Sequence, residues 1–318
     1  MQIKETEFQD KKIIRWLMNG DPSICWQVIK DLLDKSEKVF DIERRKISKE
    51  GWGKKLLSKQ DKNGMWAGSL YNHKWISTTY TMLLLKSFGL PPGNSNVRPA
   101  CRILLDEGFY NDGGINYFTS LNHSETCVTG MILSVVSYFQ YDDQSIDNLA
   151  EFLLKQQMTD GGWNCQSFRG AKHSSFHSTI SVLEGLREYE KLYPEKHSTI
   201  RRSQLKGVEF LLQHRLFRSH RTEKIFDPRM TRFSFPPRWR YDILRALDYF
   251  QEANLPYDKR MKEALEIVVT RKCNDGKWLL QNRHAGKTFF EMEQVSKSSR
   301  WNTLRALRVL KKYNVILS

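Results

Sequence analysis

The sequence predicts an all-α protein built from repeated helical hairpins. A glycine-containing turn phrase recurs along the 318 residues, and an apolar run follows each copy. The runs are regularly spaced, and the alternating patterns that mark strands are nearly absent. Repetition with a period of about 50 residues is the sequence signature of a repeat architecture. The turn phrase stands at Asn63-Gly64-Met65-Trp66, Asp112-Gly113-Gly114-Ile115, Asp160-Gly161-Gly162-Trp163 and Asp275-Gly276-Lys277-Trp278.

The apolar runs superpose on one another with constant offsets. Thr79, Thr129 and Thr179 each begin a run, 50 residues apart, and 243–247 matches 303–307 at an offset of 60. A first, less regular copy covers 25–33, which brings the number of candidate units to six. We expect a single domain over 1–318, with units at roughly 12–50, 51–105, 106–155, 156–213, 214–271 and 272–318.

A second, amphipathic helix is expected between successive apolar runs. Segments 146–157, 200–213 and 257–271 carry apolar residues at spacings of three and four, the pattern of a helix with one buried face. Prolines fall between the helical segments, as expected of residues that end helices. Each unit is therefore predicted to be two helices joined by the Asp-Gly-Gly turn. Its glycines allow backbone angles that other residues resist, and its Trp packs beneath the turn.

The charge of the chain is basic and unevenly distributed. There are 51 Lys and Arg against 36 Asp and Glu, which gives a net charge of +15. Eleven basic and three acidic residues lie in 201–240, so this segment supplies eight of the fifteen excess charges. Such an excess favours an acidic ligand or partner, or forms a solvated basic face. Nucleic acid is not favoured, because no zinc-finger or ribonucleoprotein motif is present.

Cysteine usage and hydropathy predict a cytoplasmic protein. The five cysteines include no CxxC pair, and their odd number does not suggest a disulfide framework. Residues 1–10 are polar and mixed in charge, unlike a signal peptide. No apolar run approaches the roughly 18 residues that a membrane span needs. We therefore expect a reduced, cytoplasmic location without a transmembrane segment.

Helical hairpins of this period suit an open solenoid or a closed ring with the more apolar helices inside. The string Gln-x-x-x-Asp-Gly-Gly-Trp, which begins at Gln156 or Gln157 and ends at Trp163, distinguishes the two. It resembles the repeat of the terpenoid cyclases and of the β subunits of protein prenyltransferases, and the resemblance covers about 51–312. The resemblance implies an α/α toroid, a closed ring of about six helical hairpins.

In such a ring, the residues just before each inner helix face a central cavity where a ligand binds. Glu125 and Cys127 stand at the start of one inner helix, and His177 takes the place of Cys127 one unit later. A carboxylate, a thiolate and an imidazole suit zinc with an open fourth position. The alternative is a buried cysteine packed as a small apolar residue beside a histidine.

The prenyltransferase resemblance sharpens the zinc hypothesis. Those β subunits carry Asp-x-Cys and a later His as ligands of a catalytic zinc, and Glu125, Cys127 and His177 fall on these positions. The resemblance implies that zinc holds an acceptor thiolate, which attacks the first carbon of a prenyl diphosphate. This chain departs from the pattern in having Glu for Asp and no Lys or Arg in 115–124. A cyclisation started by protonation is disfavoured, because Glu125 is the one acid where cyclases place an Asp-rich motif.

A second wall of the predicted cavity combines arginines with tryptophans. Guanidinium groups bind phosphate in a bidentate way, and aromatic faces line apolar ligands. The alternative is that these arginines face solvent. The predicted ligand-binding residues are Trp75, Arg238, Trp239, Arg240, Arg300 and Trp301.

Together these features predict a prenyltransferase-like or terpene-cyclase-like protein. It would bind an isoprenoid, such as a prenyl diphosphate, or another amphiphilic anion in the central cavity, with zinc-assisted transfer as the hypothesised reaction. The competing hypothesis is a non-catalytic toroid that binds a protein or lipid partner.

Overall fold

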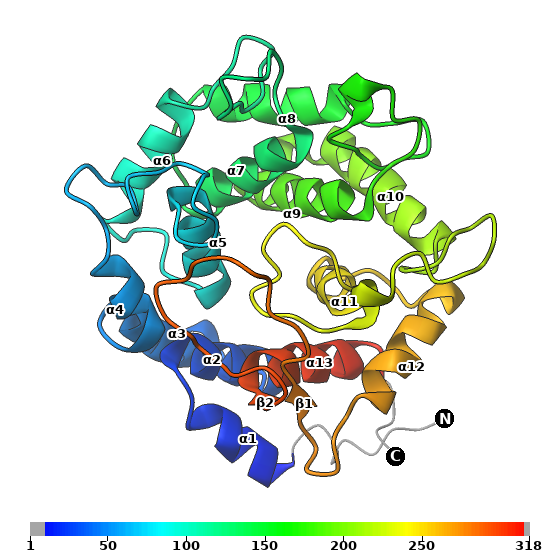
Figure 1. Ribbon diagram of the computed structural model, residues 1–318. Helices are drawn as coiled ribbons and strands as arrows, with labels where there is room; N and C mark the ends of the chain where they lie inside the picture. The colour runs from blue at the N-terminus through cyan, green and yellow to red at the C-terminus, as the bar shows by residue number, and fades with distance from the viewer. Residues whose placement is uncertain (1–9, 315–318) are drawn as a thin grey trace.

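The computed structural model describes residues 10–314, which form a closed ring of helices, an α/α toroid (Figure 1). The ring has an inner and an outer layer. The inner helices are α2 (Pro22–Gln27), α5 (Thr78–Phe88), α7 (Thr126–Tyr138), α9 (Phe176–Leu192), α11 (Ile243–Glu252) and α13 (Arg300–Lys312). The outer helices are α1 (Lys11–Met18), α4 (Gly51–Leu57), α6 (Val97–Asp106), α8 (Ser145–Lys155), α10 (His197–Gln213) and α12 (Lys262–Thr270).

The remaining elements are short and lie between these layers or at their edges. Helix α3 (Glu37–Arg44) has no buried residue and follows a single turn of π-helix, η1 (Val28–Leu32). Strands β1 (Trp278–Leu279) and β2 (Ser298–Ser299) pair antiparallel across the loop that precedes α13. Short 3₁₀ turns complete the described chain: η2 (Arg45–Ser48), η3 (Ser167–Arg169), η4 (Pro194–Lys196), η5 (Pro228–Thr231) and η6 (Lys259–Met261).

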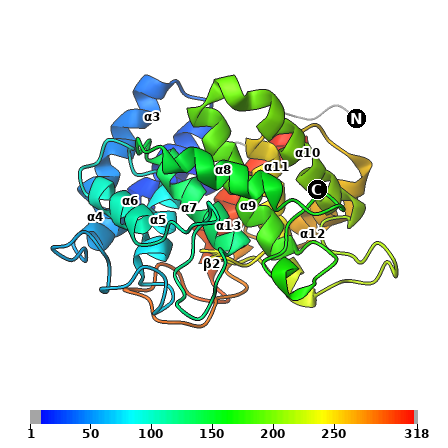
Figure 2. The same ribbon diagram turned by 90° about the horizontal axis from the view of Figure 1, so that it is seen from above.

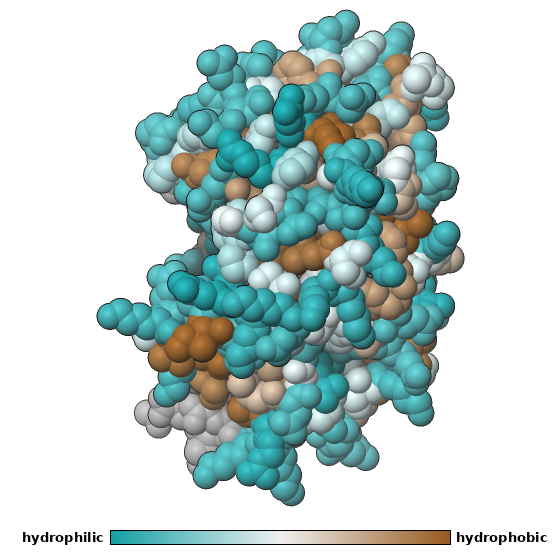
Figure 3. Space-filling model, turned by 90° about the vertical axis from the view of Figure 1, so that its left-hand side faces the viewer, coloured by the Kyte–Doolittle hydropathy of each residue, from teal (hydrophilic) through white to brown (hydrophobic). Residues whose placement is uncertain are grey.

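The apolar runs of the sequence became the inner layer. Helix α7, for example, has eleven buried residues among its thirteen, because it is enclosed on all sides by neighbouring helices. The amphipathic segments 146–157, 200–213 and 257–271 became α8, α10 and α12, with one face on the inner layer. The outside of the ring over α4 and α6 is predominantly hydrophilic, with apolar residues in small separate patches (Figure 3).

Outer and inner helices alternate along the chain, so the inner helices all run in the same direction. The loops that lead into the inner helices gather at one face of the ring, which Figure 2 shows from the side. The start of every inner helix therefore faces one mouth of the ring, and its end faces the opposite mouth.

In three units, the Trp of the turn phrase ties the outer helix to the inner helix that follows it. The indole nitrogen of Trp163 donates a hydrogen bond of 2.7 Å to the carbonyl of Leu153 in α8. Its backbone N–H donates to the hydroxyl of Thr179 in α9, at 3.0 Å. The same pair of bonds recurs at Trp66 with Leu56 and Thr78, and at Trp278 with Val268 and Thr303. The prediction that this Trp packs beneath the turn is confirmed.

The Gln and the first Gly of the phrase link it to the next outer helix. Gln157, rather than Gln156, donates to the carbonyls of Gly161 and of Ser203 in α10, at 2.7 and 2.9 Å. Gly161 has a φ of +94°, and a Cβ there would lie 2.6 Å from the carbonyl oxygen of Lys206. Both the backbone angle and this close approach require glycine.

Charged side chains close the ring between its last and first units. Arg308 of α13 donates to Gln27 of α2 at 2.9 Å and to Asp31 at 3.1 Å, and it also pairs with Asp248 of α11. Lys311 pairs with Asp34 at 2.6 Å. These contacts join the two ends of the repeat array, so the architecture is a closed ring and the open solenoid is excluded.

None of the helices in the described part of the chain is long and apolar enough to cross a membrane. The cytoplasmic location stays a prediction.

Candidate functional site

A cavity of about 1000 Å³, here called the main cavity, opens at the mouth where the inner helices begin. The starts of α7 and α9 form its walls, together with the loops before α5, α7 and α9. Glu125, Cys127, His177 and Trp239 all line it, so the structure brings four of the predicted site residues together. Its other lining residues include Tyr71, Lys74, Ile76, Phe118, Asn164, Cys165, Gln166, Ser178 and Lys287.

A smaller cavity of about 250 Å³, here called the arginine cavity, adjoins the main cavity. The two share Lys74, His177 and Trp239 as lining residues. Two carboxylates in the arginine cavity are already engaged, since Asp227 pairs with Arg229 and Asp242 caps α11. The cationic lining residues outnumber them: Lys74, Arg229, Arg232, Arg240 and Arg283.

Glu125 lies at the N-terminus of α7 and lines the main cavity. It is the N-cap residue of the helix, and its own backbone N–H donates to the carbonyl of Ile115 at 3.0 Å. Burial raises the pKa of its carboxyl group above the usual value, because a charged carboxylate is disfavoured away from water. A carboxyl group with a raised pKa can hold a proton in this cavity at higher pH than an exposed one.

Cys127 is next to a second cysteine that the repeat did not reveal. Its backbone N–H donates to the sulfur of Cys165 at 3.1 Å, and the hydroxyl of Ser178 donates to the same sulfur at 3.3 Å. The Cys127 thiol also donates to Cys165, which raises the pKa of Cys127 and lowers the pKa of Cys165. The apolar periodicity could not predict this contact, because Cys165 lies in a loop.

His177 lies between the two cavities and is held neutral. Its Nδ1 accepts a hydrogen bond of 2.8 Å from the backbone N–H of Tyr241, and its ring meets the edge of Trp239 at 5.2 Å. Burial, followed by the charges of Arg240 and Arg245, lowers its pKa to about 4.

The arrangement of these groups does not fit the zinc hypothesis. No three His, Cys, Asp or Glu side chains in residues 10–314 are grouped so that they could hold a metal ion. Nδ1 of His177 is engaged by the backbone of Tyr241, and the Cys127 thiol is engaged by Cys165. Both groups are thus already engaged within the protein, and the zinc site at Glu125, Cys127 and His177 stays a prediction.

Four of the predicted ligand residues form two stacked pairs, Arg238 with Trp75 and Arg240 with Trp239. Trp75 is buried, and its indole nitrogen donates to the carbonyls of His284 and Ala285 at 3.1 and 2.9 Å. The Arg238 guanidinium lies over the Trp75 ring at 5.2 Å, and its buried Nη1 has no hydrogen-bond partner. Burial lowers the pKa of Arg238 to about 10. The Arg240 guanidinium lies over Trp239 at 4.4 Å.

The prediction that Arg300 and Trp301 line the cavity at the mouth of the ring was wrong. Arg300 turns outward, where its Nε donates to the carbonyl of Trp16 in α1 at 3.1 Å and its guanidinium covers the Trp16 ring. Trp301 is 1% exposed and stacks on Phe235 at 3.9 Å. Helix α13 begins at Arg300, three residues earlier in the repeat than α11, so Arg300 and Trp301 belong to the helix instead of the loop before it.

The opposite mouth, where the inner helices end, holds a third cavity of about 590 Å³ that Trp301 lines. Its charged groups are largely paired with one another. Arg245 of α11 makes two hydrogen bonds of 2.8 and 2.6 Å to Glu184 of α9, and Lys86 pairs with Glu188 at 3.4 Å. Arg238 also lines this opposite cavity, so the predicted ligand residues are divided between the two mouths.

Comparison with known proteins finds likenesses of fold. No protein-family model matches the chain, and no curated protein shows significant similarity to it. The ring is similar to a protein from Actinoplanes, at 12% identity over 97% of this chain and 99% of that one, with a TM-score of 0.48. It is also similar to the type II terpene cyclase MstE from Scytonema without ligand, at 13% identity over 92% of this chain and 88% of that one.

A variant of MstE in complex with its substrate, geranylgeranyl dihydroxybenzoate, gives a comparable match. The identity is 14%, over 92% of this chain and 87% of the cyclase. Both MstE structures have a TM-score of 0.45. At such low TM-scores and identities, these likenesses do not assign an activity to this chain.

Proposed function

We propose that the chain binds an amphiphilic anion of the isoprenoid diphosphate type at the mouth where the inner helices begin. The apolar tail occupies the main cavity, and the anionic head occupies the arginine cavity. The observation that carries this proposal is that the two cavities adjoin and share Lys74, His177 and Trp239 as lining residues.

The volume and lining of the main cavity suit the apolar tail of the ligand. Its volume of about 1000 Å³ lies at the upper end of the range of ligand pockets, which suits a long chain rather than a small polar metabolite. Tyr71, Phe118 and Trp239 give it aromatic walls, with Ile76 between them. Aromatic surfaces bury hydrocarbon favourably and leave its position adaptable.

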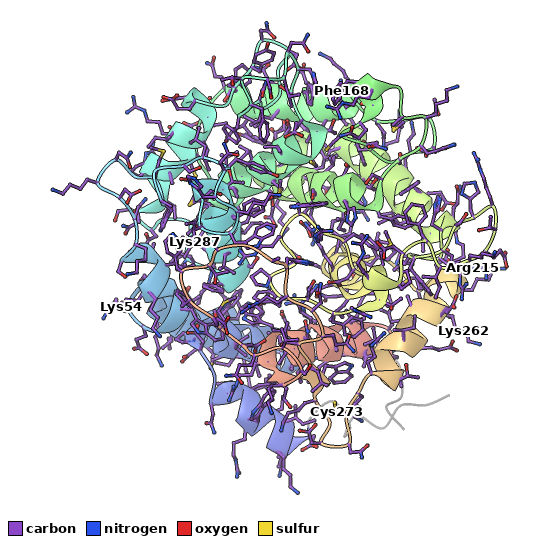
Figure 4. The ribbon with its side chains drawn as sticks, in the orientation of Figure 1. Lys54, Phe168, Arg215, Lys262, Cys273 and Lys287 are labelled. Atoms are coloured by element: carbon purple, nitrogen blue, oxygen red, sulfur yellow. The ribbon has the colours of Figure 1, made fainter. Side chains whose placement is uncertain are left out.

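The charges around the arginine cavity suit the anionic head group of the ligand. The Arg240 guanidinium contacts an aromatic ring rather than a carboxylate in the described structure, so its hydrogen-bond donors are open to a phosphate. The N-termini of α9 and α11 face the same region, and helix N-termini favour anions. Lys287, which lines the neighbouring main cavity, lies inside the ring in Figure 4, whereas Lys54, Arg215 and Lys262 lie at its periphery.

Thermal unfolding with matched ligands tests the proposal. A ligand that binds only the native state must raise the melting temperature. Geranylgeranyl diphosphate is expected to raise it by several degrees, and geranylgeraniol or pyrophosphate alone by much less, because each lacks one half of the ligand. An equal shift with the alcohol would contradict the head site, and an equal shift with pyrophosphate would contradict the tail site.

Variants locate the head group. Arg240→Gln is expected to remove most of the difference between the diphosphate and the alcohol. Arg102→Gln is the matched control, because Arg102 is an exposed arginine on the outer helix α6. If both variants keep the wild-type shift, the head does not bind in the arginine cavity.

A cyclisation started by proton transfer is a second candidate, favoured by the raised pKa of Glu125 inside the main cavity. A carboxylic acid in this position can donate a proton to an alkene. This candidate predicts a cyclic product from the bound geranylgeranyl ligand and none with Glu125→Gln. Full recovery of the unchanged ligand from the wild-type protein would favour the non-catalytic toroid instead.

A further inference from the structure

The strongest unassigned feature is the contact between Cys127 and Cys165 in the wall of the main cavity. The two residues come from different units, since Cys127 is in the first turn of α7 and Cys165 is in the loop before α9. The backbone N–H of Cys127 donates to the Cys165 sulfur at 3.1 Å, and both cysteines are free thiols in this structure. The two side chains therefore start from adjacent positions, as a disulfide requires.

The surroundings of the two sulfurs are unequal. The Cys165 sulfur accepts hydrogen bonds from the backbone N–H of Cys127 and from the hydroxyl of Ser178, at 3.1 and 3.3 Å. Donors aimed at a sulfur favour the nucleophilic anion over the thiol. The geometry therefore makes Cys165 the attacking sulfur and leaves Cys127 as the thiol beside it.

Both residues line the main cavity, unlike the other cysteines. Cys127 and Cys165 are half-buried and line the cavity. Cys25 and Cys101 are buried in the helical layers. Cys273 is half-buried but lies at the periphery of the ring, as Figure 4 shows. Cys273 is thus a natural control for thiol reactivity outside the cavity.

We propose that Cys165 and Cys127 are a redox-active dithiol that a peroxide converts to a disulfide in the wall of the main cavity. The Cys165 thiolate attacks one oxygen of hydrogen peroxide, the O–O bond breaks, and hydroxide leaves and is protonated to water. Cys165 is now a sulfenic acid. The Cys127 sulfur then attacks the Cys165 sulfur, and the Cys127 proton leaves with the hydroxyl group as a second water. Two electrons pass from the thiols to the peroxide.

The disulfide would tie the loop at 164–166 to the start of α7. Asn164 and Gln166 flank Cys165 and line the same cavity, so the bond would fix one part of its wall. This inference rests on the cysteine geometry alone and does not depend on the ligand proposed above.

Peroxide titration with peptide mass mapping tests the dithiol. The full-length protein is treated with hydrogen peroxide in the presence of a chelator, and free thiols are then alkylated. The wild-type protein is expected to lose two hydrogen masses and to yield one cross-linked peptide pair, Cys127 with Cys165. Cys165→Ser should abolish the disulfide, and Cys273→Ser, the matched control, should leave its yield unchanged.

Two further variants separate the roles of the sulfurs. With Cys127→Ser, the reaction is expected to stop at a Cys165 sulfenic acid, which dimedone captures. With Ser178→Ala, the rate of disulfide formation should fall about tenfold, the loss expected for one hydrogen bond to a charged acceptor. The proposal is overturned if the wild-type protein forms no cross-linked pair, or if Cys273 is oxidised before Cys165.

Discussion

His284 shows how the arginine cavity lowers the pKa of a histidine that lines it. Its ring lies in the arginine cavity, where Nε2 is 3.2 Å from the hydroxyl of Ser234. Burial, followed by the charges of Arg240, Arg238 and Arg245, lowers its pKa to about 4 from a usual value of 6.5. The folded protein therefore resists protonation of this imidazole over a range where the unfolded chain accepts a proton.

The pKa of His284 predicts how stability depends on pH. As pH falls from 6.5 towards 4, the unfolded state takes up a proton that the folded state refuses, so the free energy of unfolding decreases. His284→Gln removes this difference and should make the decrease shallower, although His177 still contributes. Urea unfolding at pH 7.5 and pH 5 measures the effect. If the free energy of unfolding falls between pH 7.5 and pH 5 by the same amount in the variant and the wild type, the lowered pKa of His284 is contradicted.

At the scale of the element, the threonine that begins an inner helix is a structural requirement. The hydroxyl of Thr179 accepts a hydrogen bond from the backbone N–H of Trp163, and both residues are buried. Thr179→Val keeps the shape but leaves that N–H without a partner, so the free energy of unfolding should fall by about 1–3 kcal/mol. Thr222→Val, at an exposed loop position, is the control and should change stability little. Equal effects of the two substitutions in chemical denaturation would refute this role.

The same elements show what the sequence could predict. The inner and outer helices followed from their apolar spacing, because burial on all sides or on one face leaves distinct patterns. The choice between Gln156 and Gln157 did not follow, because it depends on a contact with Ser203 in another unit. Glu125, Cys127 and His177 were correctly brought to one cavity, since they precede inner helices at equivalent positions.

The repeat pattern did not predict where the residues of the long loops lie. Cys165 and His284 belong to the site, but no periodic signal marks them, because loop conformations depend on contacts between units. Arg300 was misplaced because α13 begins three residues earlier in the repeat than α11, so Arg300 lies in the helix and its side chain contacts α1 instead of the mouth.

At the scale of the whole molecule, Arg308 holds the ring closed. It pairs with Asp248 and Asp31, which are 14% and 20% exposed, and it joins the last inner helix to the first unit. Arg308→Met leaves both carboxylates without this partner and should lower the free energy of unfolding by about 3–5 kcal/mol. Arg45→Met breaks an exposed pair with Asp41 and should cost at most about 1 kcal/mol. Unfolding in guanidinium chloride compares the two variants. Similar decreases in the free energy of unfolding would show that closure of the ring does not depend on Arg308.

The central claim is that one amphiphilic anion spans the main cavity and the arginine cavity. A crystal structure of the protein with geranylgeranyl diphosphate tests it most directly. We expect density for the tail between Tyr71, Phe118 and Trp239, and diphosphate oxygens within hydrogen-bond distance of Arg240. Density in the opposite cavity or on the outside of the ring, with the main cavity empty, would contradict the account.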